Sequence, residues 1–410
     1  SKLRATSSAT TPMPQPRLDH TRLATRCVHA GHRPDGAERA LVTPIVRSTT
    51  FLLDEQAYRL REAGRSEAAR VYSRESYPGL EALEVRLAAL EGAAGAVAFA
   101  SGQAALHAAL LAALPPGAPL LASRKLYGGS LALLSELLPR QASPLLRFAP
   151  DDPEELARIL PAGGALVLVE SLSNPDLCLA DLPALAAVCR RAGAHLLVDA
   201  TFVSPALQRP LEFGADLVMH SATKYLGGHS DLLGGVLAGG GELLERARRW
   251  RTLAGGVLDP EAAFLLERGL KTLALRLEAQ CRGAELLARR LCAHPQVRRV
   301  LHPSLASGRQ RELAERLLAR PGAMVSFELA GGDPRAGAFA RALRLILEAA
   351  SLGGVESLVS LPARMSHVGL SPEQRLAAGI GPGQVRLSVG IEDPEDLWAD
   401  LEQALAASAP

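Results

Sequence analysis

The sequence lacks an excess of charge of either sign. Its 45 lysines and arginines nearly balance 43 aspartates and glutamates, for a formal net charge of +2. That balance argues against a nucleic-acid partner and against a membrane-surface protein. Cysteine is scarce, and the five residues form no CxxC pair and are odd in number. A disulfide framework and a zinc site are therefore not expected, and a reducing compartment fits best.

Long hydrophobic runs are missing as well. No apolar stretch approaches the length of a membrane span, and residues 1–17 lack the hydrophobic block of a secretion signal. This Ser/Thr/Pro-rich start is expected to be a disordered tail. Together these absences predict a cytoplasmic protein whose partner is neither a membrane nor a nucleic acid.

The sequence is rich in hydrophobic residues, which make up 48% of a chain of 410 residues that is too long for one compact core. Short apolar runs alternate with helical patterns, which favours an α/β fold with a mostly parallel sheet covered by helices on both faces. A long helical pattern over 262–291 leads into a smaller α/β domain. The expected strands of the sheet are 97–99, 165–169, 195–198, 217–219 and 232–237.

Lys224 is the most informative residue, because it follows the apolar strand at 217–219 within the run HSATKYLGG (220–228). A lysine at the end of a core strand is costly to bury as a cation, and a desolvated lysine with a lowered pKa is suited to forming a Schiff base. The alternative is a lysine that extends from the strand end to solvent. Ser221 and Thr223 beside it are suited to holding a phosphate.

Two further strand ends carry polar residues. Ser101, Gly102 and Gln103 open a helix after the first expected strand, where free N–H groups favour a phosphate; an ordinary serine N-cap is the alternative. Asp199 ends the third strand, and a buried carboxylate needs a partner such as a protonated ring nitrogen, a metal ion or a helix N-terminus. Ligands of open α/β sheets sit beyond the carboxyl ends of strands. The three strand ends together therefore predict a pyridoxal phosphate site and no metal site.

Several segments resemble the cysteine/methionine-metabolism family of pyridoxal phosphate enzymes, in the family's order and over nearly the whole chain. They include FASGQAA (99–105), YGG (127–129), SNP (173–175), HSATKYLGGHSD (220–231), SLGGVESL (351–358) and VRLSVGIED (385–393). The resemblance implies a fold-type I transferase, similar to aspartate aminotransferase. It divides the chain into a tail and arm that contact the neighbouring subunit (1–72), a cofactor-binding domain (73–265), and a connector helix with the C-terminal domain (266–410).

The same resemblance implies roles for individual residues. Lys224 is the Schiff-base lysine and later moves protons between substrate carbons, while Tyr127 stacks on the cofactor ring and handles protons of the substrate. Asp199, with Thr201 close by, pairs with the pyridine nitrogen. The implied assembly is a homotetramer whose active sites are shared within dimers. The expected phosphate ligands are Ser101, Gly102, Gln103, Ser221, Thr223 and, from the neighbouring subunit, Tyr72 and Arg74.

For the substrate, the resemblance implies that Arg386 holds the α-carboxylate with the help of Ser351 and Asn174, a task suited to a bidentate guanidinium. Glu356 resembles the glutamate that binds the distal amino group of cystathionine or cysteine. Each role has a structural alternative: a surface ion pair for Arg386, and an acid at a helix start for Glu356. For Tyr72 and Arg74, expected from the neighbouring subunit, the structural alternative is that they are ordinary exposed side chains.

The resemblance favours γ-replacement or γ-elimination on an O-acylhomoserine or cystathionine, as in cystathionine gamma-synthase and gamma-lyase. Cystathionine beta-lyase, methionine gamma-lyase and O-acylhomoserine sulfhydrylase are the enzymatic alternatives, and a cofactor-binding relative without turnover is the alternative of another class. Gly129 stands where methionine gamma-lyases typically carry a cysteine, which disfavours methionine cleavage. Departures from the family pattern at Tyr77, Ala200 and Arg364 point to a specialised substrate.

Overall fold

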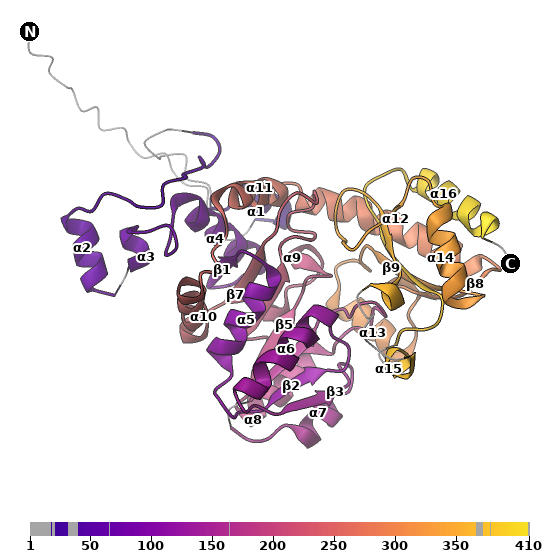
Figure 1. The fold of residues 1–410 in the computed structure, drawn as a ribbon, viewed down its shortest axis with the longest axis horizontal. Helices are drawn as coiled ribbons and strands as arrows, with labels where there is room; N and C mark the ends of the chain where they lie inside the picture. The colour runs from indigo at the N-terminus through magenta and orange to yellow at the C-terminus, as the bar shows by residue number, and fades with distance from the viewer. Residues whose placement is uncertain are drawn as a thin grey trace, which may run out of the picture.

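The computed structural model describes residues 18, 21–31, 40–64, 66–163, 165–365, 372–377 and 379–408. Within them the chain forms a larger body around one sheet and a smaller body around a second sheet (Figure 1). Helix α12 (Leu273–Ala293) leads along the chain from the first body to the second. This arrangement confirms the predicted α/β class, and the predicted domain boundaries stay predictions.

The larger sheet has the strand order β1-β7-β6-β5-β4-β2-β3. β7 runs antiparallel to both of its neighbours, and the strands from β6 to β3 are parallel. β2 and β3 are not among the predicted strands, because periodicity does not separate short apolar runs from helix in a Leu- and Ala-rich region. The strands are β1 (Gly95–Phe99), β2 (Leu120–Ser123), β3 (Leu145–Phe148), β4 (Leu166–Glu170), β5 (His195–Asp199), β6 (Leu217–Ser221) and β7 (Gly235–Gly239).

Both faces of this sheet are buried, because alternate residues of one strand enter two separate cores. On β5, Leu197 packs in one core, whereas Leu196 and Val198 pack in the other. The core around Leu197 is closed by α5 (Gly102–Ala113), α6 (Gly128–Arg140) and α10 (Gly241–Ala254). The opposite core is closed by α4 (Pro78–Glu91), α7 (Pro153–Ile159), α8 (Leu182–Ala192), α11 (Pro260–Leu270) and α12.

The smaller sheet has the order β10-β11-β12-β9-β8. Helices α12, α14 (Gly332–Ala342) and α16 (Pro394–Ala407) cover it, and Phe327 and Phe339 meet edge to face in the core between them, with ring centroids 5.8 Å apart. The strands are β8 (Val297–Leu301), β9 (Met324–Leu329), β10 (Leu347–Glu348), β11 (Leu358–Ser360) and β12 (Gln384–Ser388).

The predicted helical pattern over 262–291 is present as two helices, because α11 ends at Leu270 and α12 begins at Leu273. The break lies beside the loop that follows β6. A Cβ on Gly269 would stand 2.2 Å from the carbonyl oxygen of Gly227, so only glycine allows the two backbones to approach so closely. Arg276 then donates to the carbonyl oxygen of Gly269 at 2.9 Å. A tertiary contact therefore decides where the helical pattern is interrupted.

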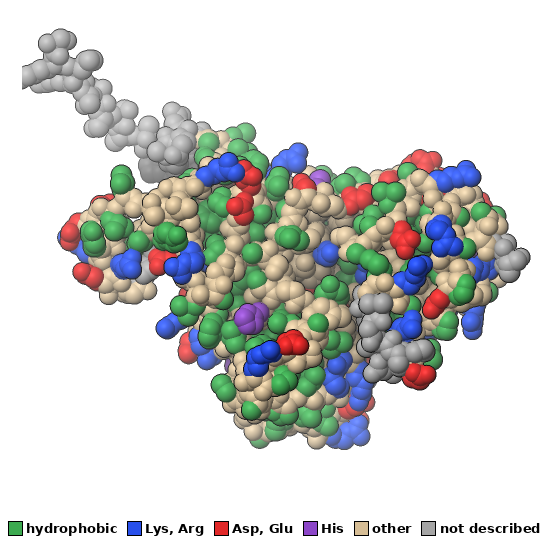
Figure 2. Space-filling model, in the orientation of Figure 1, with side chains coloured by type: hydrophobic (Ala, Val, Ile, Leu, Met, Phe, Trp, Pro, Cys, Tyr) green, Lys and Arg blue, Asp and Glu red, His purple; other side chains and the backbone are tan. Residues whose placement is uncertain are grey.

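The N-terminal segment contains α1 (Leu23–His29), α2 (Glu55–Glu62) and α3 (Ser66–Ala69). α2 and α3 project away from both bodies (Figure 1), and hydrophobic side chains are visible over this projecting part in Figure 2. Leu52 is fully exposed and Leu41 is 84% exposed. Burying such surface against another molecule is favourable, which suits the predicted arm. The predicted tail over residues 1–17 lies outside the described residues.

The remaining elements are short: α9 (Ser204–Leu207), α13 (Gly308–Leu317), α15 (Pro372–Ala377), and the 3-10 helices η1 (Pro210–Phe213), η2 (Pro303–Leu305) and η3 (Pro362–Arg364). In the described part of the chain, each helix is too short or too polar to cross a bilayer. The same residues contain no group of three or more His, Cys, Asp and Glu side chains that could hold a metal ion.

Candidate active site

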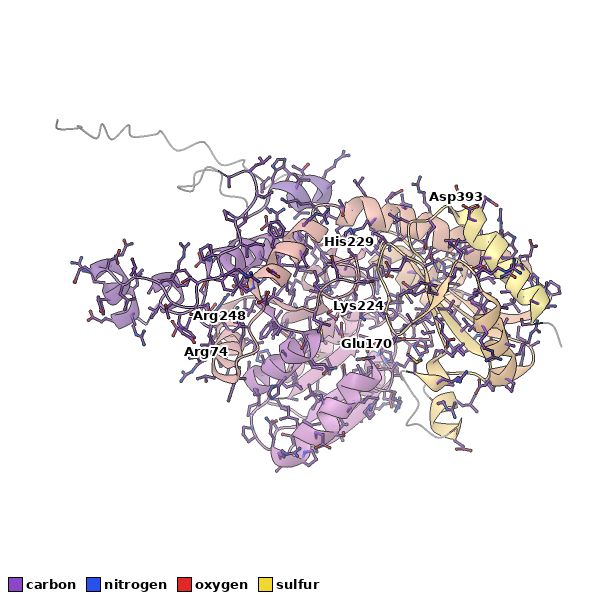
Figure 3. All side chains as sticks on the ribbon, turned by 45° about the horizontal axis from the view of Figure 1, so that its top comes forward. Arg74, Glu170, Lys224, His229, Arg248 and Asp393 are labelled. Carbon is purple, nitrogen blue, oxygen red and sulfur yellow. The ribbon has the colours of Figure 1, made fainter. Side chains whose placement is uncertain are left out.

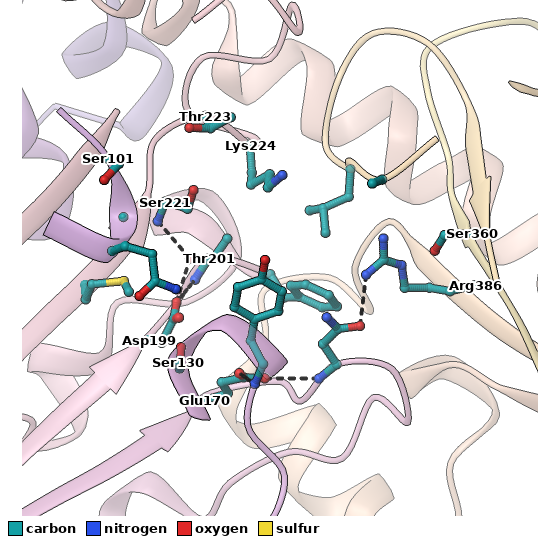
Figure 4. Close-up of a pocket in the computed structure, with 18 of the residues that line it drawn as sticks. Ser101, Ser130, Glu170, Asp199, Thr201, Ser221, Thr223, Lys224, Ser360 and Arg386 are labelled. Carbon is teal, nitrogen blue, oxygen red and sulfur yellow. Dashed lines mark hydrogen bonds between the residues drawn. The ribbon is translucent and has the colours of Figure 1, made fainter. Parts of the chain in front are cut away.

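A cavity of about 490 Å³ lies at the carboxyl ends of the strands of the larger sheet, as expected for a ligand site of this class of sheet. Residues of the smaller body, among them Ser360 and Arg386, complete its wall. Lys224 extends into it from the larger body and Arg386 from the smaller one (Figure 4). The cavity therefore depends on residues from both bodies.

The start of α5 and the end of β6 form one wall of small polar groups. Ser101 is the N-cap of α5, and its hydroxyl accepts from Ala104 N at 3.1 Å, so the ordinary cap is present. A Cβ on Gly102 would stand 3.0 Å from that of Ser221, so glycine brings the helix start against the strand end. Thr223 and Gln103 also line this wall. Free N–H groups of a helix N-terminus beside hydroxyl groups fit a phosphate.

Asp199 ends β5 at the floor of the cavity. Its Oδ1 accepts from the backbone N of Thr201 at 2.9 Å and from the Thr201 hydroxyl at 2.5 Å. Burial raises the pKa of Asp199, while the bonds from Thr201 lower it. Its Oδ2 makes no hydrogen bond with the described residues, so one acceptor remains for a ligand. A protonated ring nitrogen is a donor that suits a buried carboxylate of this kind.

Lys224 follows β6, and its Nζ donates to the Ser351 hydroxyl of the smaller body at 3.2 Å. Burial, with the nearby positive charge of Arg386, lowers the pKa of Lys224. A lysine amine with a lowered pKa is a better nucleophile toward an aldehyde at neutral pH, because more of it is unprotonated. The predicted position of a Schiff-base lysine therefore has the electrostatics that such a residue needs.

Arg386 lies in β12 and is only 6% exposed. It donates to Asn174 Oδ1 at 2.9 Å and to the backbone oxygen of Ser351 at 3.2 Å, while its Nε has no hydrogen-bond partner among the described residues. Burial lowers its pKa to about 10. In the described part of the chain it pairs with no carboxylate, so the alternative of a surface ion pair is wrong. A buried guanidinium held only by neutral groups is complementary to an incoming carboxylate.

Tyr127 stands directly before α6, lines the cavity and is 44% exposed. Gly129 makes room for it. A Cβ at that position would stand 2.4 Å from Cε1 of Tyr127 and 2.8 Å from Nε2 of Gln103. The ring position in this protein therefore depends on the absence of a side chain at 129.

Glu170 is a cavity residue that is not among the predicted site residues. It ends β4 directly opposite Asp199 in the parallel register. Its Oε1 accepts from the backbone N of Tyr127, and its Oε2 accepts from the backbone N of Asn174 at 3.1 Å. Burial and the neighbouring Asp199 raise its pKa well above the ordinary value. The available sequence signal was a lone acid after the apolar run LVLV, the same pattern that marked Asp199.

Four predicted site residues lie outside the cavity wall: Tyr72, Arg74, Ser351 and Glu356. Arg74 donates to the backbone oxygen of Thr252 at 3.0 Å, and its guanidinium lies 5.6 Å from the ring centroid of Tyr72. Figure 3 shows Arg74 on the arm side of the molecule, away from Lys224. Glu356 bonds to the Ser230 hydroxyl instead of facing the cavity. Their predicted roles stay predictions.

A parallel sheet with a lysine, a carboxylate and a helix N-terminus at its carboxyl end defines a pyridoxal phosphate enzyme of fold-type I. Residues 24–406 match the model of the family described as Cys/Met metabolism PLP-dependent enzyme. The chain belongs to this family, which confirms the resemblance and the predicted cofactor. The protein is thus a pyridoxal phosphate-dependent enzyme, and the alternative of a non-catalytic relative is not supported.

Known proteins similar to this chain include a lyase and two synthases. L-methionine gamma-lyase of Pseudomonas putida is 42% identical, over 94% of this chain and 98% of its own length. Cystathionine gamma-synthase of Escherichia coli is 41% identical over 94% of this chain and 98% of its own. The crystal structure of cystathionine gamma synthase from Xanthomonas oryzae pv. oryzae, in complex with aminoacrylate and cysteine, has a TM-score of 0.88 at 41% identity. It covers 94% of this chain and 98% of its own.

Proposed function

We propose that the protein catalyses γ-replacement or γ-elimination on an amino acid that carries an O-acyl or sulfur substituent, with an O-acylhomoserine or cystathionine as substrate. The observation that carries the proposal is the placement of Lys224 and Arg386 in one cavity, one as a desolvated amine and the other as a buried, carboxylate-free guanidinium. Together they provide a proton carrier and a carboxylate clamp for one amino acid.

The residues present fit the cofactor. The start of α5 with Ser221 and Thr223 would hold the phosphate, Asp199 would accept from the ring nitrogen, and Lys224 would bind the aldehyde. When bound, pyridoxal phosphate supplies an electron sink for the charge that develops when the substrate loses its α-proton.

The protein groups perform the binding and the proton transfers. Arg386, held by Asn174 and Ser351, binds the α-carboxylate and fixes which substrate bond faces the amine. With the cofactor bound, the Lys224 amine would take the α-proton of the substrate and would then act as acid and base at the neighbouring carbon. The phenol of Tyr127, at the open side of the cavity, donates a proton to the departing group.

Methionine gamma-lyase is the second candidate, because such an enzyme from Pseudomonas putida is 42% identical. Gly129 argues against it, since this chain carries no side chain at position 129, next to the ring of Tyr127. The same cavity groups also serve the reactions of cystathionine beta-lyase and O-acylhomoserine sulfhydrylase, so the products formed decide among these activities.

The working unit of this proposal is a homo-oligomer, a tetramer with active sites shared within dimers, in the cytoplasm. The exposed apolar arm around Leu52 supports a partner surface. The pair of Tyr72 and Arg74 lies on the arm side, from where it would reach the phosphate of a neighbouring subunit.

Product analysis of the cofactor-loaded protein tests the reaction. Separate samples receive cystathionine, methionine, and O-acetyl- or O-succinylhomoserine with and without cysteine, and Lys224→Ala serves as the control for background reaction. We expect 2-oxobutyrate, or cystathionine when cysteine is present. Pyruvate with homocysteine would instead identify a β-lyase, and methanethiol from methionine would favour the second candidate.

A further inference from the structure

Glu170 lines the cavity, but none of the roles described above involves it. It is 6% exposed, ends β4 and lies opposite Asp199. A buried carboxyl beside a second, half-buried carboxyl is costly, because each disfavours ionisation of the other. The presence of the Glu170 carboxyl is explained if it makes contacts that a neutral or smaller side chain cannot make.

Its two oxygens bind two different segments of the active site. Oε1 accepts from the backbone N of Tyr127, the residue that directly precedes α6. Oε2 accepts from the backbone N of Asn174 at 3.1 Å, in the loop after β4. The side chain of the same Asn174 accepts from Arg386 at 2.9 Å. One carboxyl therefore links the start of the tyrosine segment to the carboxylate clamp, as the dashed line from Glu170 in Figure 4 shows for one side.

The chemistry of the two partners explains why the residue is acidic. Both are N–H donors, and a carboxylate can accept at each of its oxygens. A glutamine accepts at only one position and turns its NH₂ group toward the other donor. That donor would then be buried without a partner, which costs free energy and moves its segment.

We propose that Glu170 is a positioning residue. Through these two backbone contacts it places Asn174, which orients Arg386 for the α-carboxylate, and it places Tyr127 at the start of α6. The inference rests on the roles proposed above for Arg386 and Tyr127, and it does not depend on which reaction the enzyme performs. In this proposal Glu170 acts through these contacts and does not itself hold the α-carboxylate or the departing group.

The test measures ligand binding to the cofactor-loaded enzyme, followed by the absorbance of the bound cofactor. L-Norvaline has an amine and a carboxylate but no leaving group, and n-butylamine is the same molecule without the carboxylate. We expect Glu170→Gln to weaken norvaline binding about tenfold and butylamine binding by less than about twofold, as follows from one unpaired buried donor next to the clamp. A merely structural role would weaken both ligands alike.

A double-mutant cycle tests whether Glu170 acts on Arg386 through Asn174. Asn174→Ala removes the oxygen that holds Arg386 but keeps the backbone N–H that binds Glu170, and we expect it also to weaken norvaline selectively. Because both changes break the same connection from Glu170 to Arg386, the double variant should lose little more norvaline affinity than either single variant. Multiplying losses, or equal weakening of the two ligands, would overturn the proposal.

Two variants keep the test decisive. Glu84→Gln is the control, because Glu84 is a buried acid that also accepts a backbone N–H, from Ala98 at 2.9 Å, but lies outside the cavity wall. It should leave the norvaline preference unchanged. If Glu170→Gln does not fold, Glu170→Asp keeps the carboxyl group on a shorter side chain and should show a smaller selective loss. An unselective loss counts against the proposal. Neither ligand has a leaving group, so the binding test can be interpreted even if the proposed γ-chemistry is wrong.

Discussion

Gly129 allows a quantitative prediction about the position of Tyr127. Replacing it with alanine places a Cβ 2.4 Å from Cε1 of the tyrosine ring, whereas carbon atoms in ordinary contact are at least about 3.5 Å apart. The ring must therefore move by about 1 Å. The amide of Gln103, 2.8 Å from the same point, must move as well.

The cost of this movement should fall on activity and not on folding. Tyr127 is 44% exposed, so its ring can turn outward without opening a buried cavity. We expect the free energy of unfolding to change by less than about 1 kcal/mol. A displacement of about 1 Å in a catalytic group can reduce the rate by about 100-fold, so we expect kcat to fall by about 10- to 100-fold for Gly129→Ala.

The chain contains a matched control. Gly79 is also the second residue of a helix and also follows a tyrosine by two positions, but its Cβ would stand 3.5 Å from the ring of Tyr77. Gly79→Ala should keep kcat within about twofold of the parent. Steady-state kinetics and urea unfolding of both variants check the prediction. A Gly129→Ala enzyme with unchanged kcat would refute the argument that the bare backbone places the ring.

Three further predictions follow from other parts of the structure. Arg386→Lys should raise KM about 10- to 100-fold with a smaller change in kcat, because two charge-assisted hydrogen bonds to the carboxylate are lost; an unchanged KM in steady-state kinetics would rule out the clamp. Burial lowers the pKa of His302 to about 4 from 6.5, so the unfolded chain takes up a proton first as the pH falls. Stability should therefore drop by about 3 kcal/mol between about pH 6.5 and 4, and His302→Gln should flatten that part of an unfolding titration; an equally steep loss would contradict it. Inactive Arg74→Ala and Lys224→Ala subunits should regain part of the activity when assembled together, whereas sites built within one chain would stay inactive.

The sequence was sufficient for those site residues whose chemistry depends on local context. Lys224, Asp199 and the start of α5 each follow a short apolar strand, and the rule that ligands bind beyond the carboxyl ends of strands places them in one region. The structure has all three in the wall of one cavity. Their burial, which shifts the pKa of Lys224 down and that of Asp199 up, follows from the apolar strands that precede them.

Other features could not be read from the sequence, because they depend on distances between segments far apart in the chain. Glu170 and Asn174 are four positions apart, but the third partner, Tyr127, comes from a different strand end. Glu356 fits a family pattern, and only the fold shows that it bonds to Ser230 outside the cavity wall. The break between α11 and α12 arises from the backbone contact at Gly269, which no periodicity reveals.

The sequence by itself determined the class of fold, the cofactor and the chemical identity of the groups at the strand ends, because apolar patterning and residue type are local properties. The tertiary structure decided how these groups are held. Arg386 reaches the cavity from a different sheet, its partner Asn174 follows β4, and Glu170 connects that loop to Tyr127. Such connections depend on the packing of two bodies against each other, and packing is a property of the folded chain as a whole.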